Sequence, residues 1–146
     1  MKLCELLTLS ASQVNDLLEL MRELNPDLAV TSEMITCAAE SANTHLFALM
    51  DGERIIGTAS LCVYSSPTGL KASVEDVVVS SLYRGQGLGK KLMEHVIAFA
   101  RTELRNVDLH LTSRPERVAA NELYKKLGFE KRETNAYEMK VREGEL

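Results

Sequence analysis

The chain has 146 residues, 45% of them hydrophobic, and this length suits one compact domain, which we expect to span residues 1–146. Its formal net charge is −4, from 17 basic and 21 acidic residues, so the composition argues against a nucleic acid or an anionic membrane as partner. Apolar runs are only a few residues long and the N-terminus lacks a signal-peptide pattern, which indicates a cytoplasmic protein.

The first forty residues predict a strand and two helices. A short strand is expected over residues 2–7. Ser10 and Gln13 form a capping-box pair that opens an amphipathic helix, and this helix ends before Pro26. A second, shorter helix is expected over residues 32–40.

Three strands should follow these helices. The runs "HLFALM" and "RIIGTASLCVY" flank Asp51-Gly52, a dipeptide that tolerates positive φ in a tight hairpin turn. A second turn at 65–69 leads into "LKASVEDVVVS". Its three consecutive valines predict a central strand that is covered on both faces.

The second half of the chain predicts a long amphipathic helix over 88–104 and a strand over 107–113. Ser113 and Glu116 form a second capping-box pattern, which opens a helix that Gly128 ends.

The last segment, "GFEKRETNAYEMKV", predicts two short strands. This order of elements indicates an α/β (α+β) fold with a mixed, mostly antiparallel central sheet and about four flanking helices.

The cysteines are three in number and widely spaced, at Cys4, Cys37 and Cys62. This spacing favours neither a disulfide framework nor a metal cluster, and we expect buried free thiols, since cysteine packs as a small hydrophobic side chain. His45 and His95 have no second ligand at metal spacing, so no metal is expected.

A glycine-rich stretch, "YRGQGLGKK" at 83–91, joins the valine strand to the long helix. Glycines at alternate positions let the backbone adopt unusual φ values and approach a ligand closely. A helix start presents unpaired N–H groups and a partial positive charge, while Arg84, Lys90 and Lys91 add cations. Because an ordinary turn seldom needs this pattern, we expect a phosphate-binding loop.

The spacing of the glycines excludes two familiar ligands. A dinucleotide fingerprint, G-x-G-x-x-G, would need glycine where Lys90 stands. An ATP-binding P-loop would need Ser or Thr where Lys91 stands. The loop therefore predicts a different diphosphate.

The pattern Arg84-x-x-Gly87-x-Gly89 resembles the pyrophosphate loop of the GNAT superfamily, the acetyl-CoA-dependent N-acetyltransferases. The resemblance extends to "VEDVVVSSLYRGQGLGKKLMEHVIAFAR" and to "ANELYKKLGFEKR". It is specific over 74–130, whereas the first 50 residues match only in the pattern of elements.

This resemblance implies that acetyl-CoA is the acetyl donor and that the acetyl group passes directly to a primary amine of a small molecule in a ternary complex. It also implies a sheet that splays where the cofactor enters. The implied cofactor-binding residues lie on the valine strand, the loop and a later helix: Val77, Val78, Val79, Arg84, Gly85, Gln86, Gly87, Leu88, Gly89, Lys90, Asn121 and Tyr124.

Acetyl transfer to an amine needs a base, because an amine with a pKa of about 10.4 is protonated at neutral pH. Glu75 and Asp76 are the candidates, and regular strand alternation would send them to opposite faces, with Glu75 as first choice. Solvent-exposed carboxylates without a catalytic role are the alternative. His110 is a further candidate for a base, against a merely packed or exposed histidine.

Two other groups are needed at the reacting centre. A backbone N–H of Val77 or Val78 is expected to stabilise the oxyanion. The Tyr124 phenol is expected to protonate the departing thiolate, with a core aromatic as the alternative.

The acceptor is left open by the sequence. One stretch resembles the glucosamine 6-phosphate N-acetyltransferase branch, and Arg114 and Arg117 would suit a phosphate, yet "TSRPERVAANELYKKLGF" resembles other bacterial members. The alternatives are a protein or peptide N-acetyltransferase, acting on an N-terminal or lysine amine, and a CoA-binding module without catalysis. Acceptor selectivity is expected from 25–31 and 133–135, and a homodimer stays open.

Overall fold

The computed structural model describes residues 1–144. The chain divides into two compact units, Met1–Thr112 and Ser113–Leu146, and the second is described as far as Gly144. Each unit is treated by itself below.

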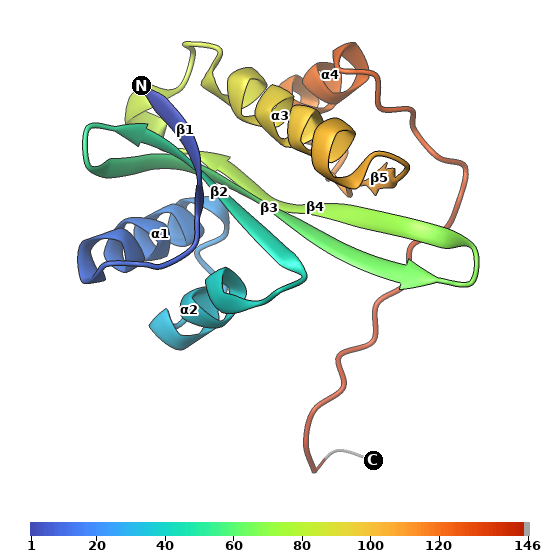
Figure 1. Cartoon of the computed structure of the whole chain (residues 1–146), viewed down its shortest axis with the longest axis horizontal. Helices are drawn as coiled ribbons and strands as arrows, with labels where there is room; N and C mark the ends of the chain where they lie inside the picture. Colours follow the sequence, from blue (N-terminus) through green and yellow to red (C-terminus); the bar gives the residue numbers. More distant parts are fainter. Residues whose placement is uncertain (145–146) are drawn as a thin grey trace. The chain divides into compact units, whose positions relative to one another are not determined.

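The first unit is built on a five-stranded sheet in the order β1-β2-β3-β4-β5 (Figure 1). Its strands are β1 (Lys2–Leu6), β2 (Thr44–Asp51), β3 (Arg54–Ser66), β4 (Gly69–Val79) and β5 (Asp108–His110). Neighbours from β1 to β4 are antiparallel, and β5 runs parallel to β4. The mixed, mostly antiparallel sheet expected from the sequence is confirmed.

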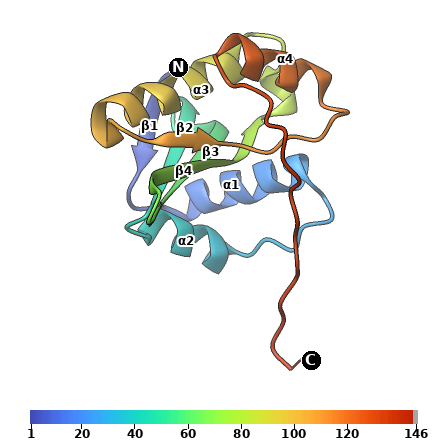
Figure 2. The same cartoon turned by 90° about the vertical axis from the view of Figure 1, so that its right-hand side faces the viewer.

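Helices cover both faces of this sheet. The helices of the first unit are α1 (Ala11–Leu24), α2 (Ser32–Glu40) and α3 (Leu88–Phe99), and α3 continues as a π-helical turn over Ala100–Leu104. A short 3₁₀ helix, η1 (Ser81–Tyr83), follows β4. Figures 1 and 2 show α1 and α2 on one face of the sheet and α3 on the other.

Apolar side chains of the sheet pack against each of these helix layers. On the α1 and α2 face, Leu46 and Ala48 of β2 belong to one buried cluster with Leu17 of α1 and Ile35 of α2. On the opposite face, the Phe47 ring lies 5.1 Å from the Phe99 ring of α3 and 5.4 Å from the His95 ring. The alternation along β2 thus supplies both faces of the core.

The cap of α1 follows the sequence pattern. The Gln13 backbone N–H donates to Ser10 Oγ at 3.2 Å, and the Ser10 N–H donates to Gln13 Oε1 at 3.0 Å. This reciprocal pair satisfies two amides that the helix start would otherwise leave open, so the predicted capping box is confirmed.

The first hairpin turn lies one residue later than predicted. Asp51 belongs to β2 and pairs with Arg54, so the two turn residues are Gly52 and Glu53. Gly52 has φ +60°, which suits the first central position of a two-residue hairpin.

The second unit contains α4 (Val118–Lys126). The predicted capping box of Ser113 and Glu116 is wrong, because α4 starts from Arg117 without a side-chain cap. The residues before it form a turn, which the Arg117 N–H closes on the Arg114 carbonyl at 3.1 Å.

Gly128 ends α4 as predicted. It has φ +106°, and its N–H donates to Lys125 O at 3.1 Å, while the Phe129 N–H donates to Tyr124 O at 3.0 Å. This pair of bonds forms a Schellman motif, in which glycine avoids the strain of a positive φ.

The two strands predicted at the C-terminus are wrong, because residues 129–142 form no strand. Tyr137, Met139 and Val141 alternate as in a strand, yet all three are exposed. Alternation makes a strand only where a neighbouring edge supplies ladder hydrogen bonds, and Ser113–Gly144 has no strand to supply them.

All three cysteines are free, as expected, but they are not all buried. Cys37 is exposed on α2, and Cys4 and Cys62 are half-buried. No helix in the described part of the chain has the length and apolarity that a bilayer crossing requires.

We predict that Leu17→Ala lowers the free energy of unfolding by about 3 kcal/mol, because Leu17 is 2% exposed and its truncation leaves a cavity under the sheet. Urea denaturation measures this loss. Leu7→Ala is the control, since Leu7 is 70% exposed and should change stability by less than about 0.5 kcal/mol. Equal effects of the two variants would contradict the packing described above.

Candidate functional site

A β-bulge interrupts β4 close to its C-terminal end. Asp76 and Val77 of β4 lie opposite one residue, Ala59 of β3, between the flanking pairs Thr58 with Val78 and Ser60 with Glu75. Asp76 has φ +53°, a left-handed conformation that few non-glycine residues adopt and that is better tolerated by aspartate than by most. Such strained backbone clusters at functional sites.

The bulge changes which way the following side chains face. Val78 joins the face of Glu75 and packs in the α1 and α2 cluster, and Val79 packs with Leu49 and with Leu88 of α3. Regular alternation would have reversed both. The regular alternation on which the expected opposite faces of Glu75 and Asp76 rested is therefore interrupted at Asp76.

The expectation that the valines are covered on both faces is only partly met. Val78 is buried, but Val77 and Val79 are half-buried. β5 pairs with β4 only from Lys71 to Ser73. Beyond Ser73, within residues 1–144, no strand pairs with β4 on the side of β5, so the backbone at Val77–Val79 has an open edge there.

A row of polar side chains crosses the sheet beside the bulge. Four half-buried residues stand in register on β2, β3, β4 and β5, on the face that α1 and α2 cover: Thr44, Cys62, Ser73 and His110. Glu75 is two residues beyond Ser73 on the same face, and Ser73 Oγ donates to Glu75 Oε1 at 2.6 Å. The bulge thus adjoins a polar surface in an otherwise apolar sheet.

Burial and, to a smaller extent, neighbouring charges shift two protonation equilibria at this surface. Loss of hydration raises the pKa of the Asp76 carboxyl, and the neighbouring Glu75 carboxylate raises it further. Burial also raises the pKa of the Cys62 thiol, and a hydrogen bond with Thr44 lowers it by less. The carboxylates of Glu75 and Asp76 add to the rise. Asp76 is therefore a stronger base than an ordinary aspartate, whereas the Cys62 thiol stays protonated at neutral pH.

The glycine-rich loop opens α3 in the way that its sequence predicts. Gly85 has φ +83°, and Gly87, the residue that caps α3, has φ +71°. The first intrahelical bond runs from the Lys91 N–H to Gly87 O at 3.2 Å, so the amides of Leu88, Gly89 and Lys90 lie in the open first turn.

The backbone of this loop is open to approach at its glycines. A Cβ atom placed on Gly85 or Gly87 would meet no atom within 4 Å, so the glycines provide for backbone conformation and for an open approach rather than for tight packing. Consecutive amides and the positive end of the α3 dipole both favour an anion there.

The cationic side chains of the loop are partly engaged. Arg84 Nε donates to Val79 O at 3.2 Å, and Lys90 Nζ lies 3.7 Å from Glu94 Oε1. An anion at this loop would therefore meet backbone amides in the first place. Arg84 also ties the loop to the open end of β4.

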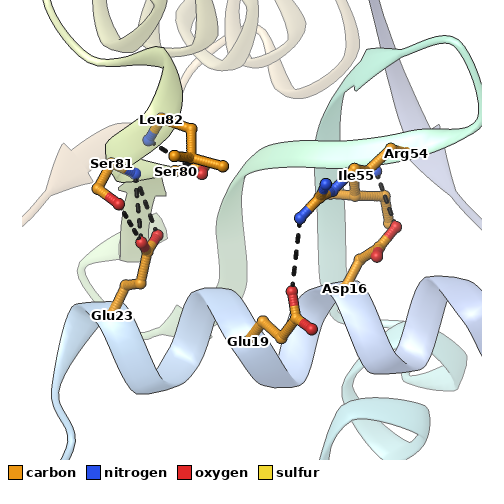
Figure 3. Close-up of polar contacts among 8 residues, drawn as sticks. All are labelled: Asp16, Glu19, Glu23, Arg54, Ile55, Ser80, Ser81 and Leu82. Atoms are coloured by element: carbon orange, nitrogen blue, oxygen red, sulfur yellow. Dashed lines mark hydrogen bonds and ion pairs between the residues drawn. The ribbon is translucent and has the colours of Figure 1, made fainter.

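Two carboxylates from distant elements hold η1, which joins β4 to the loop. Glu23 of α1 accepts hydrogen bonds from Ser81 (Figure 3), and Asp51 of β2 accepts one from Tyr83 Oη at 2.7 Å. These contacts span 58 and 32 residues, and no pattern in the sequence signals them. A signal for the bulge did exist, because Asp76 is a charged residue in phase with the buried Ala72 and Val74.

Asn121 and Tyr124 belong to the second unit, where both lie on α4. Asn121 Nδ2 donates to Arg114 O at 3.0 Å, which ties α4 to the turn before it. Tyr124 is 7% exposed, and its ring contacts the Phe129 ring at a centroid distance of 6.1 Å. Burial raises the pKa of the Tyr124 phenol, and the positive charge of Arg117 lowers it by a smaller amount. The phenol therefore stays protonated at neutral pH.

Known proteins resemble this chain in sequence. A profile of the acetyltransferase (GNAT) family matches residues 12–129. Over 82 residues, the chain is 37% identical to N-acetyltransferase 8B of Rattus norvegicus, and this match spans 55% of the chain and 36% of that relative.

Solved structures resemble the whole chain. A putative acetyltransferase of Agrobacterium tumefaciens has a TM-score of 0.80 and 21% identity, covering 96% of this chain and 100% of its own. An acetyltransferase of Trypanosoma brucei has a TM-score of 0.69 and 27% identity, covering 97% of this chain and 96% of its own. An aminoglycoside acetyltransferase from an uncultured soil metagenomic sample, in complex with trehalose, has a TM-score of 0.76 and 16% identity over 97% and 96%.

The five-stranded sheet with helices on both faces is the fold that these acetyltransferases share. Since the family profile covers most of its length, the chain belongs to the GNAT family of acetyltransferases.

We predict that Asp76→Asn stabilises the fold at neutral pH. The raised pKa means that the folded state opposes the charged carboxylate, and asparagine removes the charge while tolerating a positive φ equally well. The gain should be complete above the folded-state pKa and should vanish below about pH 4, where the aspartate is protonated in both states. Melting temperatures of both proteins between pH 3 and pH 9 measure it.

A melting temperature that is lower for Asp76→Asn at pH 8 would contradict this sign. Glu138→Gln serves as the control, because Glu138 is exposed in the second unit and should leave the pH profile unchanged.

We also predict opposite effects of adding a methyl group to two glycines of the loop. Gly87→Ala should lower the free energy of unfolding by about 1 kcal/mol, because alanine is strained at φ +71°. Gly89→Ala should raise it by up to about 1 kcal/mol, because Gly89 lies within α3. Chemical denaturation of both variants tests this, and a loss at both positions would show that the methyl group clashes rather than strains.

Proposed function

We propose that this chain is an acetyl-CoA-dependent N-acetyltransferase that transfers the acetyl group directly to a primary amine of a small molecule in a ternary complex. The main support is one observation: a loop with two left-handed glycines opens α3, and only the short η1 separates this loop from the bulged, open-edged end of β4. An anion site and an open strand edge thereby follow each other along one chain segment, as a diphosphate with an extended arm requires.

The donor would be held mainly by backbone groups. The amides of Gln86, Gly87, Leu88, Gly89 and Lys90 would bind the diphosphate, with Arg84 and Gly85 completing the loop. The open edge at Val77–Val79 would bind the pantetheine arm, although Val79 O already accepts from Arg84. Acetyl-CoA supplies, when bound, an acetyl group activated as a thioester.

The proton of the attacking amine would pass to the carboxylate pair of Glu75 and Asp76. The raised pKa of Asp76 supports this residue as the acceptor of the proton, while the 2.6 Å bond from Ser73 supports a fixed position for Glu75. The amide of Val77 or Val78 would stabilise charge on the carbonyl oxygen, and the bulge supports this role because it frees backbone groups from the ladder.

On the departing side, Tyr124 would give its proton to the thiolate of CoA, and Asn121 would support the sulfur end. The raised pKa of Tyr124 supports this role, because a proton donor must be protonated before the step. The other support for these roles is that Asn121 and Tyr124 match residues of the family in the segment "ANELYKKLGFEKR".

A small cationic amine is the acceptor that we favour. The two carboxylates beside the polar row of Thr44, Cys62, Ser73 and His110 supply negative charge where the amine would arrive. The aminoglycoside acetyltransferase among the structural neighbours is consistent with this class.

Thermal unfolding tests the donor. Acetyl-CoA at about a hundred times its dissociation constant should add roughly 2.7 kcal/mol to the free energy of unfolding. An unchanged melting temperature would refute the proposal. Release of free CoA is then measured with a panel of amino sugar phosphates, polyamines, aminoglycosides and peptides, and the compound that is turned over identifies the acceptor. Turnover of peptides alone would indicate a protein substrate in place of a small amine. Binding of acetyl-CoA without turnover of any amine would indicate a CoA-binding module.

We predict that Tyr124→Phe lowers kcat by about 100-fold and leaves the Kd of acetyl-CoA within about twofold, because only the proton is removed. Steady-state kinetics and a binding titration separate these effects. Tyr137→Phe is the control, since Tyr137 is 89% exposed. Equal kcat for Tyr124→Phe and the native chain would assign Tyr124 to packing alone.

Replacing the carboxylates distinguishes the two candidates for the base. If Asp76 takes the proton, Asp76→Asn should lower kcat by about 100-fold and abolish the loss of rate that acid causes, while Glu75→Gln has the smaller effect. The reverse order would assign the base to Glu75.

A further inference from the structure

The segment that joins β4 to the glycine loop is held by a side chain from another layer of the fold. Glu23, near the C-terminal end of α1, accepts three hydrogen bonds from Ser81 (Figure 3). The Ser81 backbone N–H donates to Glu23 Oε1 at 3.3 Å and to Oε2 at 3.2 Å, and Ser81 Oγ donates to Oε1 at 2.5 Å. One carboxylate thus fixes the first residue of η1.

The loop that follows has little to hold it in place. Its glycines lose more conformational freedom on ordering than any other residue would, and Gly85, Gln86 and Gly87 are exposed. Ordering of the loop must therefore come from its ends. Tyr83 is tied to Asp51 at the other end of η1, and α3 begins at Leu88.

The position of Glu23 on α1 is unfavourable in itself. α1 ends at Leu24, and the negative end of the helix dipole disfavours an acidic side chain in the last turn. Truncating Glu23 should therefore not weaken α1, and alanine is the best helix former. The favourable interaction that Glu23 makes is its hydrogen bonding with Ser81.

We infer that Glu23 is a positioning residue for the diphosphate loop, which it keeps in its anion-binding conformation by anchoring Ser81. This inference rests on the proposed function. The affinity for a ligand falls in proportion to the fraction of molecules whose site is correctly formed, so loosening the anchor weakens acetyl-CoA binding without touching the chemistry.

α1 offers a matched control one turn away. Glu19 is also a glutamate on the sheet side of α1, but its carboxylate lies 3.7 Å from the Arg54 guanidinium at the start of β3, and both side chains are more than half exposed (Figure 3). An exposed ion pair of this length has little effect, and Arg54 is not part of the loop.

Two measurements on Glu23→Ala, Glu19→Ala and the native chain test the inference. The first is the Kd of acetyl-CoA by titration calorimetry, with kcat at saturating acetyl-CoA. The second is amide hydrogen exchange of residues 81–90 in the absence of ligand. Glu23→Ala should raise the Kd about tenfold, as loss of a charge-assisted hydrogen bond implies, with kcat unchanged and faster exchange in this segment.

Glu19→Ala should change the Kd by less than about threefold and leave this exchange unaltered. Ser81→Ala should repeat part of the effect of Glu23→Ala, and Ser81→Thr, which keeps the hydroxyl, should restore it. The inference is overturned if Glu23→Ala binds acetyl-CoA as the native chain does, or if Glu19→Ala weakens binding equally.

Failure of the native chain to bind acetyl-CoA would instead refute the proposed function. In that case, unchanged exchange at 81–90 in Glu23→Ala would overturn the anchor as well, since exchange is measured without ligand.

Discussion

The bulge in β4 determines how the first unit presents its chemistry. By inserting one residue opposite Ala59, with Asp76 in a left-handed conformation, it reverses the facing of Val78 and Val79 relative to a regular strand. The apolar core is completed by Val78 on one side and Val79 on the other, and Glu75 and Asp76 are left exposed at the point where the ladder is broken. A regular strand would have placed Asp76 in phase with the buried Ala72 and Val74, which a carboxylate tolerates poorly.

The end of β5 adds to this effect. Because β5 accompanies β4 for only three residues, the bulged end of β4 keeps an open edge just before the chain turns into η1 and α3. Backbone groups that a longer β5 would have paired are thus left without a strand partner beside the carboxylates. This arrangement strains the backbone at Asp76 and raises the pKa of its carboxyl, and both effects destabilise the fold. The packing of the apolar cores on the two faces of the sheet offsets this destabilisation.

The glycine loop depends on interactions that lie outside its own sequence. Gly85 and Gly87 allow the left-handed conformation of the loop but do not fix it, since glycine has many other conformations available. Glu23 from α1, Asp51 from β2 and the Val79 carbonyl each bind a residue between Ser81 and Arg84. The segment that leads into the glycine loop is therefore held by side chains of α1 and β2 and by a backbone carbonyl of β4.

Much of this could be predicted from the sequence because it is local. The capping box of α1, the Schellman glycine of α4 and the left-handed glycines before α3 each follow from residues a few positions apart, where one side chain or one φ angle decides the outcome. Runs of β-favouring residues between turn signals likewise predicted the four antiparallel strands.

Only the tertiary structure decided the rest. The bulge at Asp76 arises from pairing with β3, the bond of Glu23 to Ser81 joins residues 58 positions apart, and the last segment stays without a ladder although Tyr137, Met139 and Val141 alternate. The sequence by itself thus determined the family, most of the elements and the conformation of the glycine loop. Register, strand partners and long-range anchors required the folded chain, because each depends on two segments meeting, and neither segment alone specifies the other.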